Sequence, residues 1–129
     1  MLQEINESLA QIVGSEWVFQ EDFIRYTEVT GGVEWVQMDP AKSKFTIPDV
    51  VVKPANVEQI IQIINLANRT KTPIYPRGGG YGVAAACFPT EKGILLDLCR
   101  LNRILEIDEN NMVVRVEPGA TWGDISFEL

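Results

Sequence analysis

The sequence predicts an α+β fold in which a small mixed sheet contains a strand–helix–strand unit and an N-terminal helix precedes it. Apolar runs that suit a strand, a helix and a second strand follow one another over 50–77, and two short apolar runs over 104–117 suit a hairpin. The composition, 46% hydrophobic and 22% charged over 129 residues, is typical of one globular domain. We divide the chain into a helix with an irregular leader over residues 1–47 and a main lobe over residues 48–129.

The leader contains one clear helical pattern. Its apolar residues recur at helical spacing, at Leu2, Ile5, Leu9 and Ile12. This predicts an amphipathic helix that ends near Gly14, and the lack of a basic n-region argues against a signal peptide. Residues 15–46 have no clean period, so only a short helix near Glu21–Tyr26 is expected there. The three tryptophans are expected to be core or interface aromatics: Trp17, Trp35 and Trp122.

The strand–helix–strand unit begins with Val50–Val52, a fully apolar run that is closed by Pro54. A helix is expected next, with Asn56 as its N-cap and Gln59 three residues later. Its apolar stripe is expected to consist of Val57, Ile60, Ile61, Ile64 and Ala67, widened by Ile63 and Leu66. Pro73–Arg77 then predicts a second strand, parallel to the first and reached by a right-handed crossover.

The rest of the chain alternates short strands with turn residues. Three strands are expected, over Ile94–Leu98, Ile104–Ile107 and Met112–Glu117. The turn residues 108–111 join the last two in a hairpin, which Pro118 and Gly119 end. Thr121 and Asp124 form a capping box that starts a last helix, expected to be cut off at Leu129.

Charge and composition exclude several classes of function. The net charge is −7, and residues 1–40 hold eight acids against the lone Arg25, so nucleic acid is not an expected partner. No histidine is present, which removes histidine acid–base chemistry, and two cysteines, Cys87 and Cys99, are too few for a four-ligand zinc site. No metal site and no membrane span are therefore expected, and the few thiols favour a cytoplasmic location.

A glycine-rich loop is the main candidate for a binding site. Gly78, Gly79, Gly80 and Gly82 follow the second strand directly, and such loops let backbone amides approach an anionic ligand. Residues 69–103 hold six basic residues against two acidic ones, which also favours an anion. A plain turn between strands with scattered surface basic residues is the alternative.

Two familiar phosphate motifs do not account for this loop. No Gly-Lys pair follows the glycines, so the Walker pattern fails. The dinucleotide pattern occurs at Gly80, Gly82 and Ala85, but Pro89 leaves no room for the helix that it must open.

An ordered series of motifs carries a family resemblance. It consists of PIYPRGGGYG at 73–82, GILLDL at 93–98, LNRILEI at 101–107 and VEPG at 116–119. The series resembles the FAD-binding (PCMH-type) domain of the vanillyl-alcohol oxidase/p-cresol methylhydroxylase superfamily, in its D-lactate dehydrogenase and glycolate oxidase FAD-subunit branch. The resemblance covers about residues 49–129 and implies the first, incomplete lobe of that domain. It also implies the N-terminal part of an oxidoreductase that oxidises a 2-hydroxy acid, such as lactate or glycolate, by hydride transfer to flavin.

The resemblance also implies which residues bind the flavin. The FAD diphosphate would be wrapped, through backbone amides, by Pro76, Arg77, Gly78, Gly79, Gly80, Tyr81 and Gly82. Pro118 and Gly119 would form a second wall. Tyr81 stands where many relatives have Thr, Ser or His, so noncovalent FAD is expected. The substrate-binding part and the catalytic residues would lie beyond this lobe.

A noncatalytic module that assembles with a partner is the rival interpretation. The 129-residue chain alone is expected to be inactive, to bind FAD weakly and to self-associate, because a first lobe exposes the apolar flank that a second lobe would cover. Its partners are thus FAD, a small-molecule substrate in the full-length protein, and either a second copy or the missing second lobe.

Overall fold

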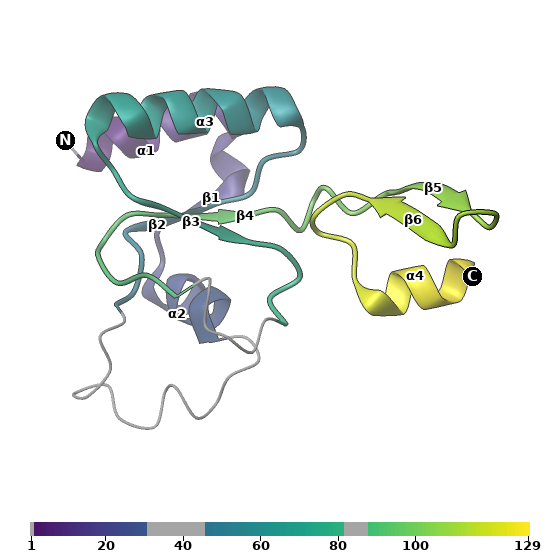
Figure 1. Cartoon of the computed structure of the whole chain (residues 1–129). Helices are drawn as coiled ribbons and strands as arrows, with labels where there is room; N and C mark the ends of the chain where they lie inside the picture. Colours follow the sequence, from purple (N-terminus) through teal and green to yellow (C-terminus); the bar gives the residue numbers. More distant parts are fainter. Residues whose placement is uncertain (1, 31–45, 82–87) are drawn as a thin grey trace.

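The computed structural model describes residues 2–30, 46–81 and 88–129 and confirms an α+β fold (Figure 1). In chain order its elements are α1 (Leu2–Val13), the 3-10 helix η1 (Ser15–Trp17), β1 (Val18–Phe19), α2 (Asp22–Thr30), β2 (Val50–Val52), α3 (Val57–Thr70), β3 (Ile74–Arg77), β4 (Ile94–Asp97), β5 (Ile104–Asp108), β6 (Val113–Val116) and α4 (Trp122–Glu128). Every expected helix and strand is present, and their ends differ from the expected ones by a few residues.

The main sheet has the strand order β1-β2-β4-β3. Strands β2 and β3 both run parallel to β4, and β1 is antiparallel to β2. The prediction that β3 runs parallel to β2 is therefore confirmed, but the two strands are not neighbours, because β4 lies between them. Burial explains this order. Every residue of β2 and β4 is buried, as inner strands require, whereas Pro76 of β3 has no N–H and is tolerated at an edge.

Helices cover both faces of this sheet. In Figure 1, α1 and α3 lie on one face and α2 lies on the other. Alternate residues of β2 enter the two layers, since Val50 and Val52 cluster with Ile63 of α3, whereas Val51 clusters with Val29 of α2. With both faces covered, the strand ends and their loops are the part of the sheet that remains to form a site.

Helix α3 has the expected start but a different buried face. The Asn56 side chain accepts a hydrogen bond from the Gln59 amide at 2.9 Å, which confirms the N-cap. The buried residues are Ile63, Leu66 and Ala67. Three residues of the expected stripe are instead exposed: Val57, Ile61 and Ile64. Apolar residues surround most of this helix, so periodicity alone did not identify the face that packs on the sheet and α1.

The leader is more regular than expected. Helix α1 ends before Gly14, whose φ is +93°, and contributes Leu9 to the core. Strand β1, which the sequence did not indicate, pairs with β2. Trp17 packs against the core, with the Arg100 guanidinium 3.7 Å from its ring centroid. Trp122 is 83% exposed and is not a core residue, and Trp35 lies outside the described residues.

Strands β5 and β6 and helix α4 form a separate group, which extends away from the main sheet in Figure 1. The hairpin is antiparallel as expected, and its turn is held by the Asn111 amide, which donates to Asp108 at 3.0 Å. The capping box of α4 is confirmed by hydrogen bonds in both directions between Thr121 and Asp124. None of the helices in the described ranges combines the length and apolar character needed to cross a bilayer.

Candidate functional site

The carboxyl ends of the three parallel strands meet at one edge of the main sheet. Lys53 directly follows β2, Asp97 ends β4, and Arg77 ends β3. Ligands of open sheets bind at this edge, because the loops that leave the strands converge there. The glycine loop, which we define as residues 78–81, starts here directly after Arg77.

The structure brings the two predicted walls of the site into contact. A Cβ on Gly78 would lie 2.6 Å from the carbonyl oxygen of Pro118, and a Cβ on Gly119 would collide with the carbonyl oxygen of Leu98. The Gly119 amide donates a hydrogen bond to the Leu101 carbonyl at 2.7 Å. Backbone atoms therefore fill the space that side chains at these glycines would need: Gly78 is required for the loop to pack on Pro118, and Gly119 for its segment to pack on residues 98–101.

Gly79 and Gly80 lack a side chain for other reasons. A Cβ on Gly79 would make ordinary van der Waals contacts, 3.4 Å to Tyr81 and 3.5 Å to Thr121. Gly80 has a φ of +79°, which favours glycine, and a Cβ there would collide with the Arg77 guanidinium. Gly79 is thus the loop glycine at which the protein itself tolerates a Cβ, so a ligand that approaches its backbone would give a separate reason for glycine.

Four consecutive amides of the glycine loop are available to bind an anion. Within the described ranges, no residue accepts a hydrogen bond from the N–H groups of residues 78–81. Successive free amides in a turn form a concave site that suits phosphate. Pro76 is exposed and carries no N–H, so it can shape the loop but cannot donate to a ligand. Gly82, the last residue of the predicted loop site, lies outside the described residues.

Next to the glycine loop, at the carboxyl ends of the parallel strands, lies a group of four charged residues, which we call the charge cluster: Glu28, Lys53, Arg77 and Asp97. The Lys53 Nζ lies 2.6 Å from Glu28 and 2.9 Å from Asp97. The Arg77 Nη1 lies 2.9 Å from Glu28 and 3.4 Å from Asp97. Asp97 is fully buried, and its other oxygen accepts a hydrogen bond from the Cys99 amide at 3.0 Å. Two cations thus balance two anions in a largely buried setting.

The cluster shifts the pKa values of its neighbours. Burial is the strongest influence on Lys53 and disfavours its charge, but hydrogen bonds to Glu28 and Asp97 outweigh it, so the pKa of Lys53 is raised. Burial, together with the charge of Asp97, raises the pKa of the Cys99 thiol. Cys99 is therefore held as a thiol and is not an activated nucleophile. Cys87 lies outside the described residues.

Sequence reasoning identified Arg77 but missed its three partners in the cluster. A charged residue at the end of each apolar strand is the signal that could have found Lys53 and Asp97. Glu28 carried no such signal, since it lies on α2 and reaches the site only in the folded chain.

Three of the six basic residues of 69–103 are already engaged within the protein. Arg77 is paired in the charge cluster, Arg100 stacks on Trp17, and Arg103 forms an ion pair with Glu117 at 2.7 Å. These three contribute little free positive charge, which leaves the loop amides as the main donors for an anion at the loop. The arrangement suits a diphosphate that lies along the loop and against Pro118, and the loop amides, which have no acceptor among the described residues, fit the flavin dinucleotide that the motifs imply.

Comparison with known proteins supports this cofactor. Residues 48–129 match the family model described as FAD binding domain. The chain is 31% identical over 123 residues to the glycolate oxidase subunit GlcD of Bacillus subtilis, covering 95% of this chain and 24% of that protein. It is 40% identical over 72 residues to the D-lactate dehydrogenase of Archaeoglobus fulgidus, covering 56% of this chain and 16% of that protein. The chain therefore spans a quarter or less of these relatives.

Solved structures agree on the fold. The substrate-bound p-cresol methylhydroxylase superimposes with a TM-score of 0.82 at 22% identity, over 98% of this chain and 24% of that one. An alkyldihydroxyacetonephosphate synthase gives a TM-score of 0.79 at 22% identity, over 98% of this chain and 26% of that one. From the family match and the related sequences, we conclude that the chain belongs to the family described as FAD binding domain, whose cofactor is FAD, and it shares the fold of p-cresol methylhydroxylase.

Proposed function

We propose that this chain is the N-terminal part of an FAD-linked oxidase or dehydrogenase that oxidises a small 2-hydroxy acid such as glycolate or lactate. The observation that carries the proposal is the row of amides at residues 78–81, which have no acceptor in the part of the chain that the structure describes and which lie in a loop packed against Pro118. The substrate class is supported by two relatives, a glycolate oxidase subunit and a D-lactate dehydrogenase.

In this proposal each part of the site has a defined task. The amides of residues 78–81 donate to the diphosphate oxygens, and the absence of a side chain at Gly79 lets those oxygens approach. Gly78 lets the loop touch Pro118, Gly119 packs on residues 98–101, and Pro76 and Pro118 shape the rims. Gly82, which lies outside the described residues, stays a predicted part of the site. As far as this segment decides, attachment to the protein is noncovalent, because Tyr81 stands where some relatives have the histidine that attaches to flavin. Bound FAD would supply the hydride acceptor, whereas these residues supply binding and orientation.

A substitution at Gly79 tests the cofactor site. We expect Gly79→Val in the complete native protein to abolish FAD binding, because its side chain would block the approach of the diphosphate to the loop amides, whereas its Cβ would make only ordinary contacts with the protein. Gly123→Val is the matched control, since a Cβ there also makes only an ordinary contact, 3.5 Å to Thr121. Flavin absorbance after gel filtration measures the outcome. Equal flavin content in the two variants would refute the assignment of the loop.

The rival function is a module that binds FAD without catalysis and acts by assembly with a partner. The exposed aromatic residues of α4, Trp122 and Phe127, favour assembly. Mixing the FAD-loaded native protein with glycolate or D-lactate under anaerobic conditions separates the two functions. Bleaching of the flavin absorbance supports the oxidoreductase, and stable oxidised flavin with every 2-hydroxy acid tried supports the module.

A further inference from the structure

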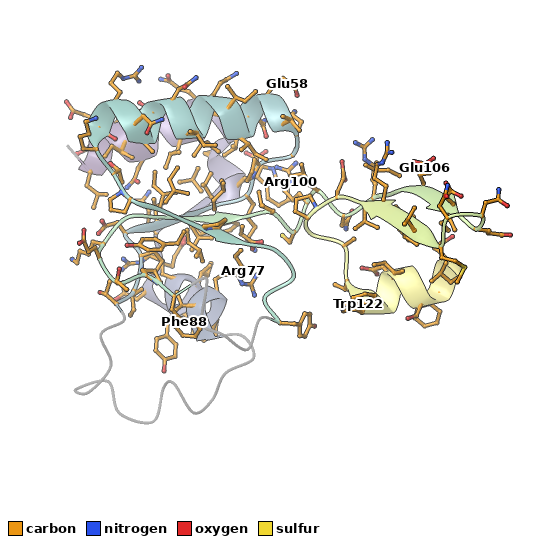
Figure 2. The ribbon with its side chains drawn as sticks, viewed as in Figure 1. Glu58, Arg77, Phe88, Arg100, Glu106 and Trp122 are labelled. Carbon is orange, nitrogen blue, oxygen red and sulfur yellow. The ribbon has the colours of Figure 1, made fainter. Side chains whose placement is uncertain are left out.

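The Arg77 guanidinium lies between two carboxylates and the glycine loop. Its Nη1 faces Glu28 and Asp97, at 2.9 and 3.4 Å. Its Nε and Nη2 face the opposite way, toward the position that a Cβ on Gly80 would occupy. Figure 2 shows this side chain extending to the side of the sheet on which α2 lies. The guanidinium thus packs directly against Gly80.

The positive charge of Arg77 is already balanced within the protein. The charge cluster contains two cations and two carboxylates, and Asp97 is fully buried. The Arg77 side chain itself is only 14% exposed, and its Nε is buried with no hydrogen-bond partner among the described residues. A guanidinium held in this way would have to break short ion pairs before it could reach a ligand, which costs more in a buried setting than at a surface.

We propose that Arg77 is a positioning residue: held by Glu28 and Asp97, it supports the left-handed backbone of Gly80 and so aligns the loop amides for the diphosphate, instead of contacting a phosphate itself. The proposal rests on the proposed function, since it assigns the loop to FAD. It makes Glu28, which lies on the leader helix α2, a determinant of flavin affinity through Arg77.

The two possible roles of Arg77 predict opposite effects of Glu28→Gln. If Arg77 positions the loop, the substitution removes one of the two carboxylates that hold its guanidinium, so the loop is held less firmly and FAD binds more weakly. If Arg77 instead binds phosphate directly, the substitution removes a carboxylate that competes with the phosphate, so FAD binds more tightly or equally well. Glutamine keeps the size of the side chain and can still accept a hydrogen bond, so the substitution changes charge more than shape.

The first measurement is the FAD dissociation constant of the complete native protein, from quenching of flavin fluorescence. We expect Glu28→Gln to raise this constant about tenfold, the size of one lost charge-assisted hydrogen bond. The matched control is Glu106→Gln. This change removes the ion pair between Glu106 and Arg115 on the exposed hairpin, in which the Arg115 Nη2 lies 3.1 Å from the carboxylate, and it should leave the FAD dissociation constant unchanged. Unchanged or tighter binding in Glu28→Gln would overturn the proposal.

The second measurement needs no flavin. Trypsin cleaves after arginine only when the side chain can enter the protease, so the bond between Arg77 and Gly78 should be cut slowly while the cluster holds Arg77. We expect Glu28→Gln to speed this cleavage several-fold in the flavin-free protein, and cleavage after the exposed Arg115 to stay constant. An unchanged rate at Arg77, or an equal rise at both sites, would contradict the positioning role. If wild type binds no FAD but the rate at Arg77 still rises, the proposed function fails while the anchoring of the loop stands.

Discussion

Gly78, Gly79, Gly80 and Gly119 differ in what a side chain would meet. Backbone carbonyls fill the space at Gly78 and Gly119, a positive φ constrains Gly80, and a Cβ on Gly79 would make only ordinary contacts. A loss of flavin after substitution therefore has different meanings at different positions. At Gly119 it would reflect a damaged fold, whereas at Gly79 it would reflect a blocked ligand.

This distinction leads to a stability prediction at the residue scale. Gly119→Ala should lower the free energy of unfolding by about 1–3 kcal/mol, because its methyl group would collide with the backbone of residues 98–101. Gly123→Ala, in helix α4, should cost nothing and can stabilise the helix. Urea unfolding followed by circular dichroism compares the two variants, and equal midpoints would show that the contact at Gly119 is relaxed easily.

Helix α3 shows how an element can be predicted correctly at its start and incorrectly on its surface. The N-cap depends on Asn56 and Gln59, which are close in sequence. The buried face depends on α1, whose Ile12 carbonyl accepts a hydrogen bond from the Gln59 side chain at 3.0 Å. Exposed Val57, Ile61 and Ile64 are left on the side away from the core.

The cap itself can be tested. Asn56→Ala removes the acceptor of the Gln59 amide and should lower the free energy of unfolding by about 1 kcal/mol. Glu58→Ala, an exposed change in the same first turn, should stay within about 0.5 kcal/mol of wild type. Denaturant unfolding measures both variants. An equal loss in both would mean that the first turn contributes through charge and not through the cap.

At the scale of the whole molecule, the group formed by β5, β6 and α4 exposes much apolar surface. Seven large hydrophobic residues there are more than a third exposed: Leu105, Ile107, Met112, Val113, Trp122, Phe127 and Leu129. A hollow of about 730 Å³ lies between β5 and α4 and is lined in part by Leu105, Ile107 and Phe127. Buried apolar area contributes about 25 cal/mol per Å², so covering this surface would strongly favour association.

We therefore expect the 129-residue chain, expressed alone, to self-associate and to bind FAD weakly. Light scattering after gel filtration should show a mass above 14.4 kDa, and a dimer is the commonest closed form. Phe127→Lys, at a residue that is 95% exposed, should shift the chain toward monomer, whereas Asn110→Lys in the hairpin turn should not. A stable wild-type monomer with stoichiometric FAD would show that this lobe is self-sufficient.

The sequence by itself determined the features that depend on neighbours a few residues apart. The Asn56 cap, the Thr121–Asp124 capping box and the turn at Asp108–Asn111 all appear where expected. The α+β class and the two walls of the flavin site followed from the order of such local signals and from the family motifs. Local backbone hydrogen bonds and apolar periodicity act within one or two turns, so a single sequence displays them directly.

Only the tertiary structure decided what depends on distant contacts. In the folded chain β4 lies between β2 and β3, one face of α3 is buried, and Glu28 of the leader forms an ion pair with Arg77. The tertiary structure also showed that Gly78 and Gly119 are needed for packing. These outcomes follow from which apolar surfaces cover one another and which buried charges must be paired, and both depend on residues that are far apart in the sequence and meet only when the chain folds.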